Sequence, residues 1–215
     1  MNHRFGILVA LLFVGLLCGL PAQAQQAAGQ VERQKGMASR SAAGGTSDLA
    51  QGGRVFVGDE ISTGPGARLQ IRFDDQSRLT LGENARITID QFVYAPSGDS
   101  RQALAIARGV FRFATGQIGK QMPRNIAFKT PVATVGIRGT VFLGGELTVG
   151  MPPGQPHYGF QITEGAVEVT SPGGSVALDE PGEGTFLPLT RIAAPTPVRQ
   201  WTEAEAAEAE AALAF

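Results

Sequence analysis

The stretch that decides the fold reads Arg68-Leu69-Gln70-Ile71-Arg72-Phe73-Asp74-Asp75-Gln76-Ser77-Arg78-Leu79-Thr80-Leu81. Apolar and polar side chains alternate on both sides of a polar turn, so every second residue faces the same way. A two-residue period buries one face of a sheet and leaves the other in water, which is typical of antiparallel strands. The stretch therefore predicts a hairpin whose register is well specified, because a slip of one residue would expose its apolar set.

The same alternation returns along the rest of the chain. It recurs at Ile87–Ile89, Val110–Phe113, Ile126–Phe128, Val141–Leu143, Tyr158–Ile162, Val167–Val169 and Val176–Leu178. The 29 glycines and 13 prolines punctuate these short runs with turns. We predict an all-β fold, an antiparallel β-sandwich or β-roll of many short strands, with a short β-solenoid as the alternative.

The first residues have the three parts of a secretory signal peptide. Arg4 gives a basic start, residues 5–20 are almost wholly apolar, and Ala22-Gln23-Ala24 places small residues before Gln25. The apolar run is shorter than the roughly 20 residues that a membrane-spanning helix needs, which disfavours an uncleaved anchor. We therefore predict a signal peptide at residues 1–24, cleaved after Ala24, and a protein that is periplasmic or secreted.

Cys18, the only cysteine, lies inside this leader. Leu17 precedes it where a lipoprotein signal needs a small residue, so we expect no lipid anchor. Removal of the leader leaves no thiol, and hence no disulfide, thiolate nucleophile or cysteine metal site. We expect the exported domain to depend on its own core for stability.

The remaining chain divides into three parts. Residues 25–52 are rich in Gln, Ala, Gly and Ser and predict a flexible lead-in, with at most a short strand near Val31. Residues 53–190 carry the strand pattern and form the predicted domain. Residues 191–215 predict a linker and an Ala/Glu-rich helical tail, in which Thr202 and Glu205 form a capping box. Because its glutamates repel one another and the segment is short, we expect this helix to fray or to dock weakly.

Titratable residues form no convergent group that would indicate a catalytic, cofactor-binding or metal site. His157, the sole histidine after the leader, is interpreted as a solvated loop residue. Asp74 and Asp75 fit turn chemistry better than a calcium loop or a carboxylate pair. Asp59 and Glu60 point to opposite faces of an extended strand, so they are not a natural acid/base couple.

Two further features could be taken for functional sites, and we interpret both as structural. Gly136-Ile137-Arg138-Gly139-Thr140 lacks the lysine and the following helix of a phosphate-binding loop. We interpret it as a bend in which glycine permits close backbone approach and Arg138 bonds neighbouring carbonyls, with ligand contact as the alternative. We expect Trp201 to cap one end of the barrel, the alternative being an exposed anchor for a partner.

Several short motifs follow one another in a distinctive order. They are Gly58-Asp59-Glu60-Ile61-Ser62-Thr63, then Ala67–Phe73 with Ser77–Leu81, Gly109-Val110-Phe111, the run Phe128–Phe142, and Glu164-Gly165-Ala166-Val167-Glu168-Val169. Together they resemble the FecR domain family, over roughly Gly53 to Phe186. The resemblance identifies a set of hallmark residues, which we interpret as turn and strand chemistry: Thr130, Pro131, Arg138, Gly139, Thr140, Glu164 and Gly165.

The chain departs from the family pattern at the hairpin turn, where Gln76 stands in place of a glycine. If that position needs a positive φ, a side chain there costs on the order of 1 kcal/mol. The family's namesake is a membrane-anchored regulator whose cytoplasmic segment touches a sigma factor and whose periplasmic part senses a loaded outer-membrane receptor. We expect this chain to lack both the cytoplasmic segment and a retained spanning helix, so the namesake's role should not transfer whole.

Function is therefore predicted at a coarse level. We expect a non-catalytic periplasmic binding or scaffold module that recognises an envelope protein or a glycan such as peptidoglycan. The alternative is a periplasmic component of a cell-surface signalling system that acts with separate membrane regulators. Charge is near balance, with 18 basic and 19 acidic residues, and we expect no nucleic-acid partner, no cofactor and no stable membrane insertion after cleavage.

The predicted cleavage can be checked by N-terminal sequencing of the protein recovered from its host. The expected product begins at Gln25, and Ala24→Arg should leave the precursor uncut because the leader peptidase needs a small residue at that position. Gln26→Arg, which lies past the cleavage site, should be processed normally. A mature product that retains residues 1–24 would show that the leader is an anchor.

Overall fold

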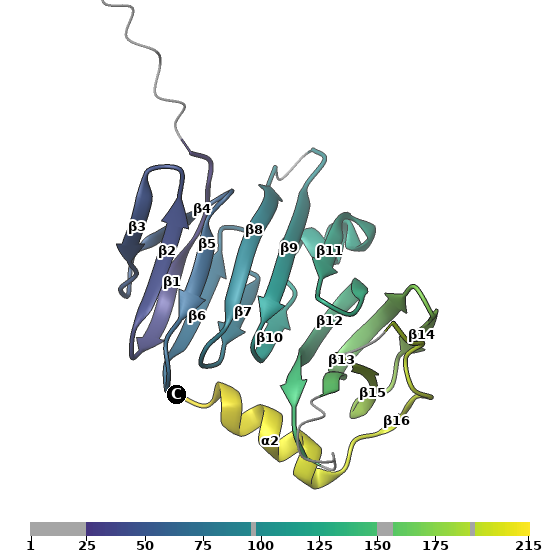
Figure 1. The fold of residues 1–215 in the computed structure, drawn as a ribbon. Helices are drawn as coiled ribbons and strands as arrows, with labels where there is room; N and C mark the ends of the chain where they lie inside the picture. The colour runs from purple at the N-terminus through teal and green to yellow at the C-terminus, as the bar shows by residue number, and fades with distance from the viewer. Residues whose placement is uncertain (1–24, 96–97, 150–156, 190–191) are drawn as a thin grey trace, which may run out of the picture.

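The computed structural model describes residues 25–95, 98–149, 157–189 and 192–215 (Figure 1). The predicted leader, residues 1–24, lies outside the described residues. The strands are β1 (Ala27–Lys35), β2 (Ala38–Ala42), β3 (Gly45–Asp48), β4 (Arg54–Phe56), β5 (Glu60–Thr63), β6 (Arg68–Phe73), β7 (Arg78–Leu81), β8 (Arg86–Val93), β9 (Arg101–Arg108), β10 (Phe111–Ala114), β11 (Ile126–Lys129), β12 (Thr134–Leu147), β13 (His157–Ser171), β14 (Gly174–Leu178), β15 (Glu183–Pro188) and β16 (Arg199–Gln200). The helical segments are α1 (Gln117–Gln121), the 3-10 helix η1 (Pro123–Asn125) and α2 (Glu203–Leu213).

The strands form one curled sheet whose two halves face each other (Figure 1). Its order is β3-β2-β5-β8-β9-β11-β12-β10-β7-β6-β1-β4, with β13, β14, β15 and β16 continuing from β12. One layer consists of β3, β2, β5, β8, β9 and β11, and the other consists of β10, β7, β6, β1 and β4. β12 lies between these two sets in the sheet and joins them. The all-β prediction is confirmed, and its form is a curled sheet in which the chain passes repeatedly between the layers.

One strand pair departs from the antiparallel prediction. β11 runs parallel to β9, with Ile126 opposite Gln102 and Lys129 opposite Ala105. A parallel pair needs a crossover connection. Here the chain leaves β9 for β10 in the other layer and returns through α1 and η1, which supplies that crossover. The sheet is therefore mixed.

The core lies between the two layers and has the predicted alternation. The inward side chains of the β6–β7 hairpin, Leu69, Ile71, Phe73, Leu79 and Leu81, are all buried. Four phenylalanines from β10, β11 and β12 pack against one another at the centre: Phe111, Phe113, Phe128 and Phe142. Each such ring contributes about 2 kcal/mol by leaving water.

Residues 25–52 were expected to be a flexible lead-in with a short strand near Val31. A strand does lie there, as β1, but β2 and β3 follow it, so the segment is part of the sheet and not a flexible lead-in. β1 lies between β4 and β6 and buries Ala28 and Val31 against the core. Gly29 permits this pairing, since a Cβ there would lie 2.5 Å from the Arg72 carbonyl oxygen. The segment has few large apolar residues at inward positions, so it lacks the apolar alternation of the other strands.

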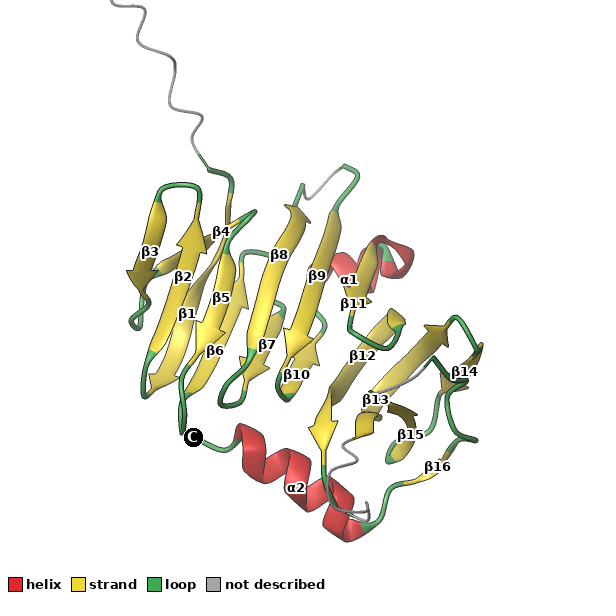
Figure 2. Ribbon diagram, viewed as in Figure 1, coloured by secondary structure: helices red, strands yellow, loops and turns green. Residues whose placement is uncertain are grey.

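The predicted C-terminal helix is present as α2 and begins with the predicted capping box. Thr202 accepts a hydrogen bond from the Glu205 amide, and the Glu205 carboxylate accepts one from the Thr202 amide. The helix lies across the ends of the strands (Figure 2). Ala209 and Leu213 of this helix are buried. Trp201, which precedes the helix, stacks on Phe186 with ring centroids 5.0 Å apart. The tail therefore docks firmly and closes one end of the core.

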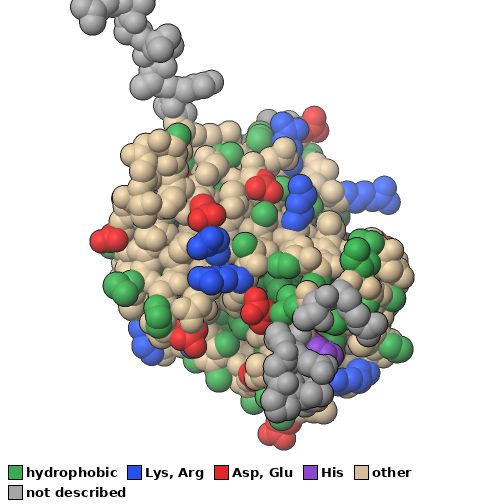
Figure 3. Space-filling model, in the orientation of Figure 1, with side chains coloured by type: hydrophobic (Ala, Val, Ile, Leu, Met, Phe, Trp, Pro, Cys, Tyr) green, Lys and Arg blue, Asp and Glu red, His purple; other side chains and the backbone are tan. Residues whose placement is uncertain are grey.

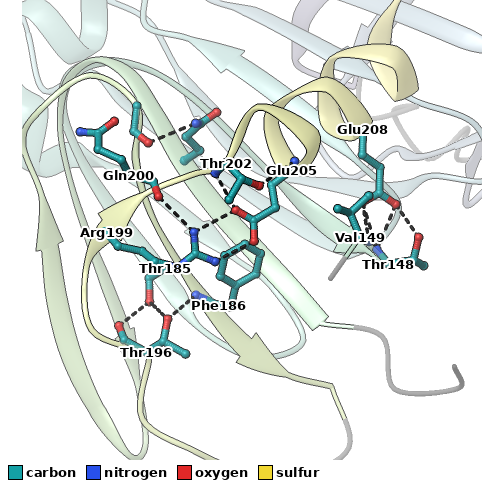
Figure 4. A network of polar contacts seen from close by, with 12 residues as sticks. Thr148, Val149, Thr185, Phe186, Thr196, Arg199, Gln200, Thr202, Glu205 and Glu208 are labelled. Carbon is teal, nitrogen blue, oxygen red and sulfur yellow. Dashed lines mark hydrogen bonds and ion pairs between the residues drawn. The ribbon is translucent and has the colours of Figure 1, made fainter. Parts of the chain in front are cut away.

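Three of the four glutamates of α2 have partners, which offsets their mutual repulsion (Figure 4). Glu208 accepts hydrogen bonds from the Thr148 amide at 2.9 Å, the Thr148 hydroxyl at 2.6 Å and the Val149 amide at 2.9 Å. Glu205 pairs with Arg199 through both guanidinium nitrogens, at 2.6 and 2.9 Å. Glu210 pairs with Arg112. Within the described ranges no helix is long and apolar enough to cross a membrane.

The Arg199–Glu205 pair predicts a dependence of stability on pH. Hydrogen bonds from Arg199 lower the pKa of the Glu205 carboxyl to about 2, against burial, which raises it. A lowered pKa adds stability above the unfolded-state pKa near 4.5, and that stability is lost as the pH falls through 2. Glu205→Gln should therefore reduce the free energy of unfolding by about 1 kcal/mol at pH 7, because water screens the half-exposed Arg199.

Urea unfolding followed by Trp201 fluorescence measures this difference, since the stacked indole reports on the docking of α2. Glu203→Gln is the matched control: it removes a charge from the same helical turn, but Glu203 makes no hydrogen bond or ion pair in the described structure. The gap between Glu205→Gln and the unmodified protein should close between pH 4.5 and 2. A gap that persists at pH 2 would contradict the role given to the ion pair.

Candidate functional site

The first two hallmark residues build the turn between β11 and β12. The Thr130 hydroxyl accepts a hydrogen bond from the Ala133 amide at 3.1 Å and lies 2.9 Å from the Ala133 carbonyl oxygen. The Thr130 amide donates to the same carbonyl at 2.9 Å. Pro131 follows Thr130 in this turn, where its fixed φ suits the reversal of the chain. Both residues act on the backbone.

The next hallmark residues form the bend at which β12 changes layer. Residues Thr134–Gly136 pair with β11, whereas Val141–Gly144 pair with β10. Between them the register against β13 shifts, and Gly139 adopts a φ of +56°. A positive φ at a bulge is the conformation that glycine adopts without strain. This bend, residues 138–140, is what allows one strand to belong to both halves of the sheet.

Two threonines clamp the bend. The Thr115 amide and hydroxyl both donate to the Thr140 carbonyl, at 3.0 and 2.7 Å, and the Thr140 amide donates back to the Thr115 hydroxyl at 2.9 Å. The Thr140 hydroxyl donates to the Glu164 carbonyl on β13. The hallmark residue Glu164 thus contributes its backbone, and its carboxylate is exposed.

Gly165 locks the bend from the opposite strand. Its φ is +79°, and a Cβ at this position would overlap the Gly139 carbonyl oxygen. The two hallmark glycines therefore lie face to face, and each needs the absence of a side chain for a different reason. Gly139 needs the left-handed backbone, whereas Gly165 needs both the backbone and the space.

Arg138 belongs to the bend, but its side chain does not help to hold it. Its side chain is exposed and, within the described parts of the chain, makes neither the expected carbonyl contacts nor any ion pair. It lies instead on the rim of a groove of about 650 Å³ on the outer face of β12, β13 and β14, which we call the bend groove. Pro123, Arg124 and Ile126 also line this groove.

The floor of the bend groove is made of three small residues and of Glu168, which lies between two of them. Gly136, Ala166 and Ala177 lie on three neighbouring strands, with Gly136 opposite Glu168 and Glu168 opposite Ala177 in the register. A Cβ on Gly136 would meet no atom within 4 Å, so the space above this floor is open. Small outward side chains beside a bend leave a trough that larger ones would fill.

A second hollow of about 420 Å³ lies on the other side of η1 and shares Arg124 with the bend groove. It is lined by residues of β8, β9 and β11, including Gln91, Arg101 and Ala127, and by Asp99. Figure 3 shows basic and acidic side chains interspersed on the face drawn. Arg124 was missed by sequence reasoning, because nothing in Met122–Asn125 marks it as different from other surface arginines.

The acidic side chains considered from the sequence serve the fold. The buried Asp75 carboxylate accepts hydrogen bonds from the Ser77 amide at 3.0 Å, the Ser77 hydroxyl at 2.6 Å and the Ile118 amide at 3.2 Å. Asp74 pairs with Arg54 at 3.1 Å. The buried Asp59 pairs with Arg40 at 3.0 Å and accepts the Phe56 amide. Each carboxylate thus holds a turn or joins two strands.

The remaining sequence candidates are placed as follows. His157 begins β13 in a partly buried position beside Phe186, and burial lowers its pKa. Gln76 has a φ of +69°, so the turn does require the conformation that a glycine would adopt more readily. The parts of the chain that the structure describes contain no group of three or more histidine, cysteine or acidic residues placed to hold a metal ion. Trp201 is buried at the α2 end of the core.

Comparison with known proteins gives a family and a fold. The family model described as FecR protein matches residues 59–168, which include the bend and the residues of the bend groove other than Ala177. A putative anti-sigma factor from Parabacteroides distasonis ATCC 8503 has a similar structure, with a TM-score of 0.50 and 17% sequence identity. The similarity covers 66% of this chain and 59% of that one, and a second structure with the same description gives a TM-score of 0.49. No curated protein matches the chain.

The interlock of Gly139 and Gly165 predicts a large effect of a single methyl group. Gly165→Ala should reduce the free energy of unfolding by about 2 kcal/mol or more, because the side chain meets both an unfavourable φ and the Gly139 carbonyl. Gly136→Ala is the matched control on the same pair of strands and should change stability by about 0.5 kcal/mol or less. Equal unfolding midpoints in urea for the two variants would contradict the interlock.

Proposed function

Because the chain belongs to the FecR protein family, we propose that it is a non-catalytic recognition component of a cell-surface signalling system. The observation that carries this proposal is the family match over residues 59–168, which covers the fold from β5 into β13. The matched region holds the bend, its clamp and most of the groove beside it.

The similarity in fold to the putative anti-sigma factor supports the same proposal. This chain covers 59% of that solved chain, and the proposal assigns it one step of a signalling pathway. Separate membrane regulators would carry the signal across the inner membrane. Recognition of an envelope protein or a glycan would be the step performed by this chain.

We place the protein in the periplasm on the strength of its first 24 residues, which have the composition of a cleaved leader. A cysteine-free mature chain needs no oxidative folding there, and its core is large enough to hold the fold without disulfides. The non-catalytic assignment rests on the regulatory character of the family and on the use of Asp59 and Asp75 as structural carboxylates.

The proposal is tested by deleting the gene in its host and comparing transcripts under conditions in which the protein is made. Loss of a signalling component should change the expression of a small, defined set of genes several-fold, and the full chain supplied in trans should restore it. A chain that starts at Gln25, without the leader, should fail to restore expression because it stays in the cytoplasm.

Each outcome bears on a different part of the proposal. An unchanged transcript profile in the deletion strain would refute the signalling role. Full restoration by the leaderless chain would refute the periplasmic location and leave the signalling role in place.

A further inference from the structure

We propose that the amino terminus of the mature chain is a modification site, at which Gln25, exposed by cleavage after Ala24, cyclises to pyroglutamate. The inference rests on the cleaved leader that supports the periplasmic location proposed above. It is carried by the different contacts that two neighbouring glutamines, Gln25 and Gln26, make in the structure. One of them is available for the reaction and the other is held by the sheet.

The reaction needs only the residue itself. The unprotonated α-amino nitrogen of an amino-terminal glutamine attacks the Cδ carbon of its own side-chain amide, which forms a carbon–nitrogen bond and closes a five-membered lactam. The bond from Cδ to the amide nitrogen breaks, and that nitrogen leaves as ammonia with the proton that the α-amine gives up. Nothing is oxidised or reduced. Because both groups belong to one residue, the step is unimolecular and gains the advantage of proximity.

Gln25 lies just outside the sheet. It is exposed, and β1 begins only at Ala27. The Gln25 side chain makes no hydrogen bond to a described residue, so its amide is free to rotate onto the α-amine that cleavage creates. Ring closure at this residue therefore breaks no hydrogen bond of the described fold.

The next glutamine is held in place. The Gln26 side-chain amide donates to the Phe92 carbonyl on β8 at 2.8 Å, and the Gln26 carbonyl accepts a hydrogen bond from the Val57 amide at 2.8 Å. Ala28, two residues further on, is fully buried. The chain is thus fixed from Gln26 onward, so the reactive terminus is a single residue beside a rigid strand.

The same contacts distinguish Gln25 from other termini in this stretch. A chain that was cut one residue later would begin at Gln26, and its cyclisation would consume the amide that bonds Phe92. A cut after Ala27 or Ala28 would remove the start of β1, which lies between β4 and β6. Of these termini, Gln25 is the one that can form the ring without loss to the sheet.

The ring changes the terminus in two ways. A free α-amine carries a positive charge for most of the time at neutral pH, whereas the lactam nitrogen is neutral. Aminopeptidases bind a free α-amine, so the ring also removes their starting point. Chain ends are preferred sites of proteolysis, and trimming through Gln26 would remove both contacts that precede β1. The modification therefore protects the first strand of the sheet.

Intact-mass spectrometry of the protein recovered from its host tests the proposal. The full chain is expressed with its leader and purified at neutral pH from fresh extract, which limits ring closure during handling. We expect most molecules to have the mass of residues 25–215 less one ammonia. Pyroglutamyl aminopeptidase, which removes only a cyclised residue, should convert the amino-terminal peptide of a protease digest into one that begins at Gln26.

Two variants that differ by one position provide matched controls. Gln25→Asn shortens the side chain by one methylene group, so ring closure would need a strained four-membered lactam, and this variant should keep its full mass. Gln26→Asn makes the same change one residue later and should still lose ammonia. Neither variant alters Ala22 or Ala24, so the leader should be removed from both.

The measured masses separate the alternatives. A mature chain that keeps the full mass of residues 25–215, a chain that begins at another residue, or loss of ammonia from Gln25→Asn would overturn the modification and leave the signalling role in place. A precursor that retains residues 1–24 would refute the periplasmic location together with the modification. The transcript profile of the deletion strain tests the signalling role separately, because the mass of the terminus does not depend on it.

Discussion

The bend of β12 at Gly139 and Thr140 is the constraint on which the rest of the structure depends. On one side of it the strand pairs with β11, and on the other side with β10 in the opposite layer. Because β12 belongs to both layers, it sets their separation and the angle at which they face each other. Phe128 from β11 and Phe111 from β10 meet Phe142 of β12 in the centre of the core, at centroid distances of 5.1 and 5.6 Å. A strand that ran straight would bring only one of these partners to it.

The C-terminal helix solves a second problem, which is how a curled sheet ends. The strand ends near β12 and β15 leave Leu143, Leu147 and Phe186 at the margin of the core. Trp201 and the apolar side of α2 cover them, although the helix itself is rich in glutamate. The acidic residues are tolerated because free backbone amides and arginines meet them on the body of the protein, as at Thr148 and Val149. Repulsion between neighbouring glutamates costs only a few tenths of a kcal/mol per pair, which such contacts exceed.

Much of the fold follows from local patterns. Alternating apolar residues marked the β6–β7 hairpin, and the capping box marked the start of α2, because in both cases the deciding contacts are short in sequence. β1 gave only a weak signal, near Val31, because its buried positions include Ala28 and Gly29, and Gly29 lets β1 approach the backbone of β6. The parallel pairing of β9 with β11 was also out of reach, because it depends on where the chain returns after α1 and η1.

The candidate site shows the same division. Thr130, Gly139 and Gly165 could be interpreted as turn and bend residues from their types alone. Arg138 could not, because its neighbours on the outer face come from η1, β13 and β14, which the folded sheet brings together. The bend turns Thr140 inward to hold the layers, whereas the side chain of Arg138 is left outside on the rim of a trough. One short motif therefore combines residues that hold the fold with a residue that lies on the surface. Substitutions at Gly139 and at Arg138 should impair the protein for different physical reasons.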